Sequence, residues 1–163
     1  MLPSSQHLKG SIFTQANLKG SFLSQANFEQ AILSDVDFKD VNLVGAILRE
    51  VHLRNVDFTK SCLMGTDFTG ADLTAANFTE ADLTATNFTG ANLISANFTG
   101  ANLRRTVFKG VKVVETELNR SLGKNDNSTH SQLAETEQFN QNQITQRAIV
   151  EGSAQDRLIV ALS

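Results

Sequence analysis

The apolar residues of this chain recur at every fifth position from about Gln6 to Arg120. The centres of these five-residue units run from Leu8 to Leu118 and number twenty-three: thirteen Leu, nine Phe and Val113. A small residue, most often Ala, lies two positions before nearly every centre. A period of five fits neither an α-helix nor a plain β-strand. The pattern therefore predicts a short extended segment followed by a corner in each unit.

The corner residues support this interpretation. Eight of the ten glycines occupy the second position after a centre, where a tight turn often needs a positive φ. Asp or Asn directly precedes the centre in thirteen units, and such side chains commonly bond nearby backbone groups in turns.

The spacing of Phe predicts four walls per coil, since both Phe and Leu recur at intervals of 20 residues. Two opposite walls are expected to carry mainly Phe and the other two mainly Leu. The two Phe series are Phe38, Phe58, Phe78 and Phe98, and Phe68, Phe88 and Phe108. Because parallel crossovers are nearly always right-handed, we expect an all-β solenoid: a right-handed quadrilateral parallel β-helix of about 5.75 coils, followed by a C-terminal tail without repeats.

These units resemble the A(D/N)LXX signature of the pentapeptide-repeat proteins, a family especially abundant in cyanobacteria. The resemblance covers about 115 of the 163 residues and is closest over residues 71–103. It implies a right-handed quadrilateral β-helix. The units that carry it include Ala71-Asp72-Leu73-Thr74, Ala81-Asp82-Leu83-Thr84 and Ala91-Asn92-Leu93-Ile94. The first coil departs from the signature before its centres, with Ile12, Phe22 and Ile32, and so does the last, with Val107, Lys112 and Glu117.

Two segments follow from this pattern: the repeat region, residues 6–120, and a tail, residues 121–163. The tail begins as a polar linker, with a weak helix from about Ser131 to Val150, and ends in the apolar residues 158–162. We expect it to cap the last coil. A homodimer contact through the tail and a partly disordered tail are the alternatives.

Charge and cysteine content narrow the choice of partners. The net charge is −3 and neither segment has a strong sign, so we expect no dominant attraction to nucleic acid or to an anionic membrane. Cys62 is the single cysteine, which excludes an intramolecular disulfide. The chain shows no secretory signal and no run of about 18 apolar residues. We therefore expect a cytoplasmic protein.

The sequence offers little for catalysis. His7, His52 and His130 have no metal-ligand spacing, and nothing adjacent to Cys62 is expected to activate its thiol. Phosphate-binding loops and nucleophile motifs are missing. We expect no enzyme, no cofactor and no metal site.

The residues that break the pattern on the outer surface are better candidates. Val44 and Met64 are 20 residues apart, so they are expected to stack on one wall beside Cys62. Arg104 and Arg105, with Lys109 and Lys112, form a basic cluster near the C-terminal end. These residues are candidates for a protein contact. Scattered surface apolar groups, and charge pairing with Glu115 and Glu117, are the simpler alternatives.

We expect a non-enzymatic scaffold or regulatory protein that presents a rigid β-helical surface to an unidentified protein partner. The resemblance implies an alternative, since some members of the family mimic DNA and bind a type II topoisomerase such as gyrase. That role needs a strongly negative rod. Here the repeat region nets only −1. The resemblance to cyanobacterial members of the family also implies regulation of cell differentiation or of a membrane assembly, which is a biological version of the first hypothesis.

Overall fold

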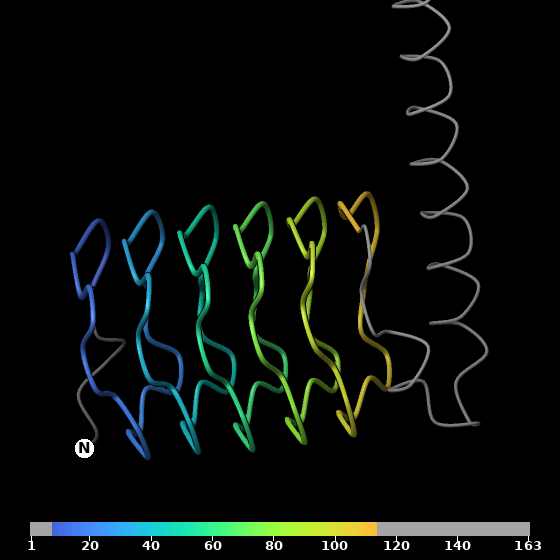
Figure 1. The fold of residues 1–163 in the computed structure, drawn as a ribbon, viewed down its shortest axis with the longest axis horizontal. Helices are drawn as coiled ribbons and strands as arrows, with labels where there is room; N and C mark the ends of the chain where they lie inside the picture. Colours follow the sequence, from blue (N-terminus) through green and yellow to red (C-terminus); the bar gives the residue numbers. More distant parts are fainter. Residues whose placement is uncertain (1–7, 114–163) are drawn as a thin grey trace, which may run out of the picture.

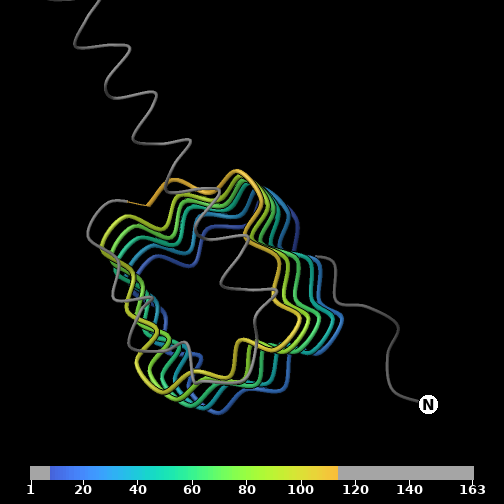
Figure 2. The ribbon, with the colours of Figure 1, turned by 90° about the vertical axis from the view of Figure 1, so that its right-hand side faces the viewer.

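A computed structural model of the protein describes residues 8–113. These residues form a stack of coils that advances along one axis, from blue to orange in Figure 1. The regular structure within them consists of turns and isolated parallel β-bridges. Seventeen bridges join residues 20 apart, from Ile12↔Ile32 to Asn92↔Lys112. The predicted repeat of 20 residues per coil is thereby confirmed, and a coil of four five-residue units has four walls, as the end-on view shows (Figure 2).

The described residues contain twenty-two of the twenty-three predicted centres. The last centre, Leu118, and the predicted tail, residues 121–163, lie outside them. None of the described residues belongs to a helix that is long and apolar enough to cross a membrane.

Every corner has the same backbone conformation. All twenty-one described residues at the second position after a centre have a φ between 55° and 69°, and thirteen of them are not glycine. At Gly90 the turn closes with the N–H of Ala91 donating to the carbonyl of Phe88 at 2.9 Å. A positive φ at the third residue is the mark of a type II turn. The fold therefore needs this conformation at each corner whichever residue is present.

Backbone hydrogen bonds join each coil to its neighbours. In the unit centred on Phe78, the N–H groups of Phe78 and Glu80 donate to the carbonyls of Asn97 and Thr99 at 2.7 and 2.9 Å. The N–H of Asn77 donates in the opposite direction, to Val56 at 2.9 Å. Since three N–H groups of a five-residue unit bond to adjacent coils, the stack is held by a continuous parallel ladder.

The core is a column of Phe and Leu side chains inside the coil. Phe rings stack along each Phe wall, as Phe58 and Phe78 do at a centroid distance of 5.2 Å. Rings from the two opposite walls meet edge to face, as Phe58 and Phe68 do at 5.7 Å. Both arrangements are favourable for aromatic pairs. The predicted division into Phe walls and Leu walls is confirmed.

The small residues before the centres include four buried hydroxyls. Each donates to a carbonyl in the preceding coil: Ser61 to Phe38, Thr66 to Leu43, Thr86 to Leu63 and Thr106 to Leu83, at 2.7 to 2.9 Å. A buried hydroxyl is costly without a partner, so these bonds explain why Ser and Thr are tolerated there beside Ala and Val.

Leu73→Asp is expected to unfold or aggregate the protein. Leu73 is fully buried, and a carboxylate placed between the layers would cost several kcal/mol. Thermal unfolding followed by circular dichroism measures the effect. Ala75→Asp is the matched control, because Ala75 is an exposed corner of the same unit. Equal melting temperatures for Leu73→Asp and the wild type would overturn the inward placement of the centres.

The corner conformation predicts opposite effects for two substitutions. Gly90→Ala should lower the stability by about 1 kcal/mol, because an L-residue at positive φ is strained. A Cβ at Gly90 meets nothing within 4 Å, so the cost there is one of backbone alone. Ala75→Gly, at a φ of 57°, should raise the stability. Urea unfolding of both variants tests this, and a gain for Gly90→Ala would contradict it.

Candidate interaction surface

The five predicted site residues lie on one wall of the coil. We name it the Met64 wall and define it as residues 22–25, 42–45, 62–65, 82–85 and 102–105. Bridges tie its coils together in the order Phe22, Asn42, Cys62, Asp82 and Asn102. Val44, Cys62 and Met64 were expected to lie together, and they do. Arg104 and Arg105 were expected as a separate basic cluster, but the register places them on this wall too, while Lys109 and Lys112 lie on two other walls.

The first three coils of the Met64 wall carry four apolar outward side chains and three uncharged polar ones, Ser24, Gln25 and Asn42. The Phe22 side chain is 84% exposed and Met64 is 38% exposed, whereas Val44 and Cys62 are half-buried. The corners beside Val44 and Met64 are Gly45 and Gly65, which add no side chain. Residues 22–25, 42–45 and 62–65 include no charged residue. An uncharged strip that is partly apolar therefore runs across three coils, with the Ser24 hydroxyl donating to the Asn42 amide oxygen at 2.7 Å within it.

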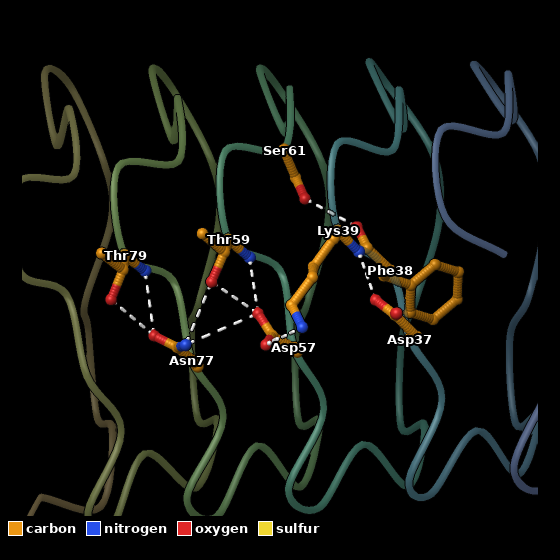
Figure 3. A network of polar contacts seen from close by, with 8 residues as sticks. All are labelled: Asp37, Phe38, Lys39, Asp57, Thr59, Ser61, Asn77 and Thr79. Atoms are coloured by element: carbon orange, nitrogen blue, oxygen red, sulfur yellow. Dashed lines mark hydrogen bonds and ion pairs between the residues drawn. The ribbon is translucent and has the colours of Figure 1, made fainter. Parts of the chain in front are cut away.

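On the wall that contains Asp57, the positions directly before and after the centre Phe58 hold polar side chains. The Asp57 carboxylate accepts from the N–H and the hydroxyl of Thr59 at 2.9 and 2.5 Å, and it pairs with Lys39 of the preceding coil at 3.1 Å (Figure 3). Asn77 of the next coil then donates to the Thr59 hydroxyl at 3.0 Å. Polar side chains therefore form a ladder that runs parallel to the backbone ladder.

In four Asp–Asn pairs, one on each wall, the order of the two residues follows from their hydrogen-bonding groups; Asp37, which is bridged to Asp57 rather than to an Asn, is an exception. An ionised carboxylate only accepts, whereas a carboxamide also donates. In each of these pairs the Asp is followed twenty residues later by an Asn. The amide of that Asn donates to the Asp carboxylate and to the hydroxyl of the Thr two residues after the Asp. The pairs are Asp57–Asn77, Asp67–Asn87, Asp72–Asn92 and Asp82–Asn102.

The ladder also favours the ionised form of three of its carboxylates. Burial by itself raises the pKa of Asp57, Asp67 and Asp72. Hydrogen bonds from the threonine two residues later and from a Lys or Arg of the preceding coil outweigh burial, so each pKa lies below its ordinary value. Arg49 and Arg54 lie 2.6 and 2.7 Å from Asp67 and Asp72. A lowered pKa stabilises the fold above about pH 4, and this contribution is lost as the pH falls through the folded-state pKa.

The far end of the Met64 wall is basic and polar. Thr84, Asn102, Arg104 and Arg105 line a hollow of about 310 Å³. The one carboxylate of this wall, Asp82, accepts from the Thr84 hydroxyl at 2.6 Å and from the Asn102 amide at 3.2 Å. The Arg104 side chain is exposed. The wall therefore changes from uncharged to cationic along its length.

The opposite wall carries a second, smaller apolar group. Ile12 and Ile32 are 70% and 39% exposed and form a bridge with each other, as their spacing predicts, and Ile32 is bridged in turn to His52. Within residues 8–113, no three His, Cys, Asp or Glu side chains gather in a way that could hold a metal ion.

Comparison with known protein families identifies the repeat. The family described as "Pentapeptide repeat region" matches residues 8–88, and the family described as "Pentapeptide repeats (8 copies)" matches residues 71–110. The chain belongs to the pentapeptide-repeat family. Its fold is accordingly the right-handed quadrilateral β-helix of that family. Among curated proteins no sequence matches it.

Comparison with solved structures finds the same fold in one pentapeptide-repeat protein and weaker likenesses to others. Rfr23 from the cyanobacterium Cyanothece 51142 is 24% identical, with a TM-score of 0.51 over 68% of this chain and 86% of that one. HetL from Nostoc sp. strain PCC 7120, a protein involved in heterocyst differentiation regulation, is 25% identical with a TM-score of 0.29 and is covered over 56% of its length by 68% of this chain. QnrB1, a plasmid-mediated fluoroquinolone resistance protein, is 17% identical with a TM-score of 0.34, over 68% of this chain and 91% of that one.

In this pentapeptide-repeat protein the largest exposed side chain of the Met64 wall, Phe22, was not among the predicted site residues. Its departure from the signature is visible in the sequence. The further signal was its number, because 22, 42 and 62 differ by 20 and therefore share a wall with Cys62.

The ladder predicts that Asn77→Asp destabilises the protein by about 1 kcal/mol more than Asn97→Asp at neutral pH. Asp at position 77 would face Asp57, and like charges opposite each other in a sheet repel. Position 97 instead follows the neutral Asn77, so Asn97→Asp is the matched control. The difference should shrink as the pH falls through the lowered pKa of Asp57, where the carboxyls take up protons. Urea unfolding at pH 7 and at about pH 2.5 measures it, and equal losses for both variants at pH 7 would refute the ladder's role.

Proposed function

We propose that this protein is a non-enzymatic interaction scaffold that binds a protein partner through the Met64 wall. The observation that carries the proposal is the uncharged strip of Phe22, Val44 and Met64. On the other walls, the third to fifth coils hold carboxylate, carboxamide and threonine ladders with cation partners, although the first two coils of the opposite wall also expose Ile12 and Ile32. Exposed apolar groups gathered on one face are typical of partner sites.

A rigid column suits this role. The interior is filled by Leu and Phe, so the described coils present walls to a ligand rather than an enclosed pocket. Residues of one column are held by backbone hydrogen bonds at a fixed coil spacing, as those from the N–H of Gly45 to the carbonyl of Met64 and from Gly65 to Thr84 hold theirs. A partner therefore meets side chains that are already ordered, which lowers the entropic cost of binding.

The DNA-mimic alternative has less support. Residues 8–113 carry ten basic and ten acidic residues, and each wall is within one unit of neutrality. The carboxylates Asp57, Asp67, Asp72 and Glu80 are each paired with a cation twenty or eighteen residues earlier. A mimic of the phosphate backbone needs an uncompensated negative surface.

Partner capture from the lysate of the source organism tests the scaffold function. We expect at least one protein to be retained by the wild type and lost with Val44→Lys/Met64→Lys. Thr14→Lys/Ser34→Lys is the matched control, because it places two lysines at equivalent positions, 20 residues apart, on the opposite wall. Melting curves must first show that both variants fold. Equal retention by the wild type and the Val44/Met64 variant, or no specific retention at all, would count against the proposal.

A further inference from the structure

We propose that the partner segment bound by the Met64 wall is a single amphipathic α-helix with apolar residues over Phe22 and Met64 and a carboxylate at Arg104. This inference rests on the scaffold function proposed above and specifies the chemistry of the ligand.

The backbone of the wall is already hydrogen-bonded, which decides the kind of segment that fits. The N–H of Cys62 donates to Val41, and its carbonyl accepts from Leu43, both at 2.9 Å. The N–H groups of Leu63 and Leu83 donate to the carbonyls of Asp82 and Asn102 in the same way. An extended peptide laid on this face would find no free backbone edge to pair with. A helix satisfies its own backbone groups and needs only side-chain contacts.

The dimensions of the wall also match a helix. Five coils at about 4.8 Å each give a height of about 24 Å, and the four residues of each unit span about 10 Å across. A helix is about 10 Å wide and covers 24 Å with about 16 residues. A stable dimer of whole proteins needs about 800 Å² per partner. One wall offers about a third of that area, so a second copy of this chain is a poorer occupant.

The coil spacing sets the spacing of the contacts along the helix. Along the coil axis Phe22 and Met64 lie two coils apart, and so do Met64 and Arg104. Phe22 precedes its centre whereas Met64 and Arg104 follow theirs, so Phe22 is offset sideways by about 7 Å, which a helix about 10 Å wide still covers. Two coils rise about 10 Å, which is the rise of seven helical residues. The expected ligand therefore has two apolar residues and one acidic residue at intervals of seven on one face, in either chain direction, with a small residue over Val44.

Charge complementarity fixes the acidic position. Arg104 is exposed beside the hollow of about 310 Å³ at the basic end of the wall. Asp82, the acidic residue nearest in the wall, is held by hydrogen bonds from Thr84 and Asn102. A carboxylate elsewhere on the ligand face would lie over the uncharged strip and lose hydration without gaining a partner.

Selection from a display library tests the inference. The library holds 18-residue helical peptides with one randomised face, and it is panned on the full-length protein with counter-selection on Val44→Lys/Met64→Lys. We expect enriched peptides to carry apolar, apolar and Asp or Glu residues at intervals of seven. Fluorescence anisotropy should then show that Arg104→Glu weakens binding about tenfold, since an attractive pair becomes repulsive. Replacing the peptide's acidic residue with Lys should restore binding to Arg104→Glu.

The other outcomes separate the two proposals. Enriched peptides that lose binding to Val44→Lys/Met64→Lys but bind Arg104→Glu as tightly as the wild type would overturn the acidic contact and leave the scaffold function standing. No enrichment after the counter-selection would overturn the helix inference, because helical peptides would then either not bind at all or bind the Val44/Met64 variant equally well. Sedimentation that reveals a wild-type dimer, lost in the Val44/Met64 variant, would identify a second copy as the occupant instead. Lysines at Thr14 and Ser34 on the opposite wall provide the control in each assay.

Discussion

Hydrogen bonds between residues twenty apart hold every coil to the next, and the other features of the structure depend on this spacing. The ladder from the N–H of Phe58 to the carbonyl of Asn77 fixes the height of each layer, and Phe58 and Phe78 stack at 5.2 Å because of it. The spacing survives only if each corner turns through the same angle. Thirteen residues that are not glycine accept a positive φ for that reason. The ladder bonds and the packed core compensate for the local strain.

Much of this architecture could be predicted because the same five-residue pattern of centre and corner recurs through the repeat region. The centres, the corners and the Phe columns all follow from counting in fives and twenties, and the structure confirms them. The ion pairs were missed. From their positions alone the aspartates are interpreted as turn residues. The pair Lys39–Asp57 joins the residue after one centre to the residue before the centre of the next coil, so it is found only by comparing neighbouring coils. The carbonyl partners of Thr66 and Thr86 depend on side-chain direction, which counting does not reveal.

The candidate surface was predicted in part. Val44, Cys62 and Met64 came together as their numbers required. Arg104 and Arg105 were grouped with Lys109 and Lys112 because they are close in sequence, but a solenoid separates sequence neighbours onto different walls. Phe22 illustrates the converse, since residues far apart in sequence share one face. In this fold, two residues at the same position of successive twenty-residue coils are neighbours in space, whereas residues a few positions apart in sequence often lie on different walls.

The same arithmetic has an evolutionary consequence. Insertion or loss of one five-residue unit would preserve the corners, the apolar interior and the backbone ladder, yet it would rotate everything beyond it by a quarter turn and break the Phe stacks and Asp–Asn pairs that cross it. Such an event between Met64 and Arg104 would leave a foldable column whose uncharged strip and basic end face different directions. Duplication of an entire coil would instead lengthen the wall and keep its faces aligned. Gene changes that look equally mild in an alignment therefore differ sharply here: those in multiples of twenty conserve surfaces, and those in multiples of five reshuffle them.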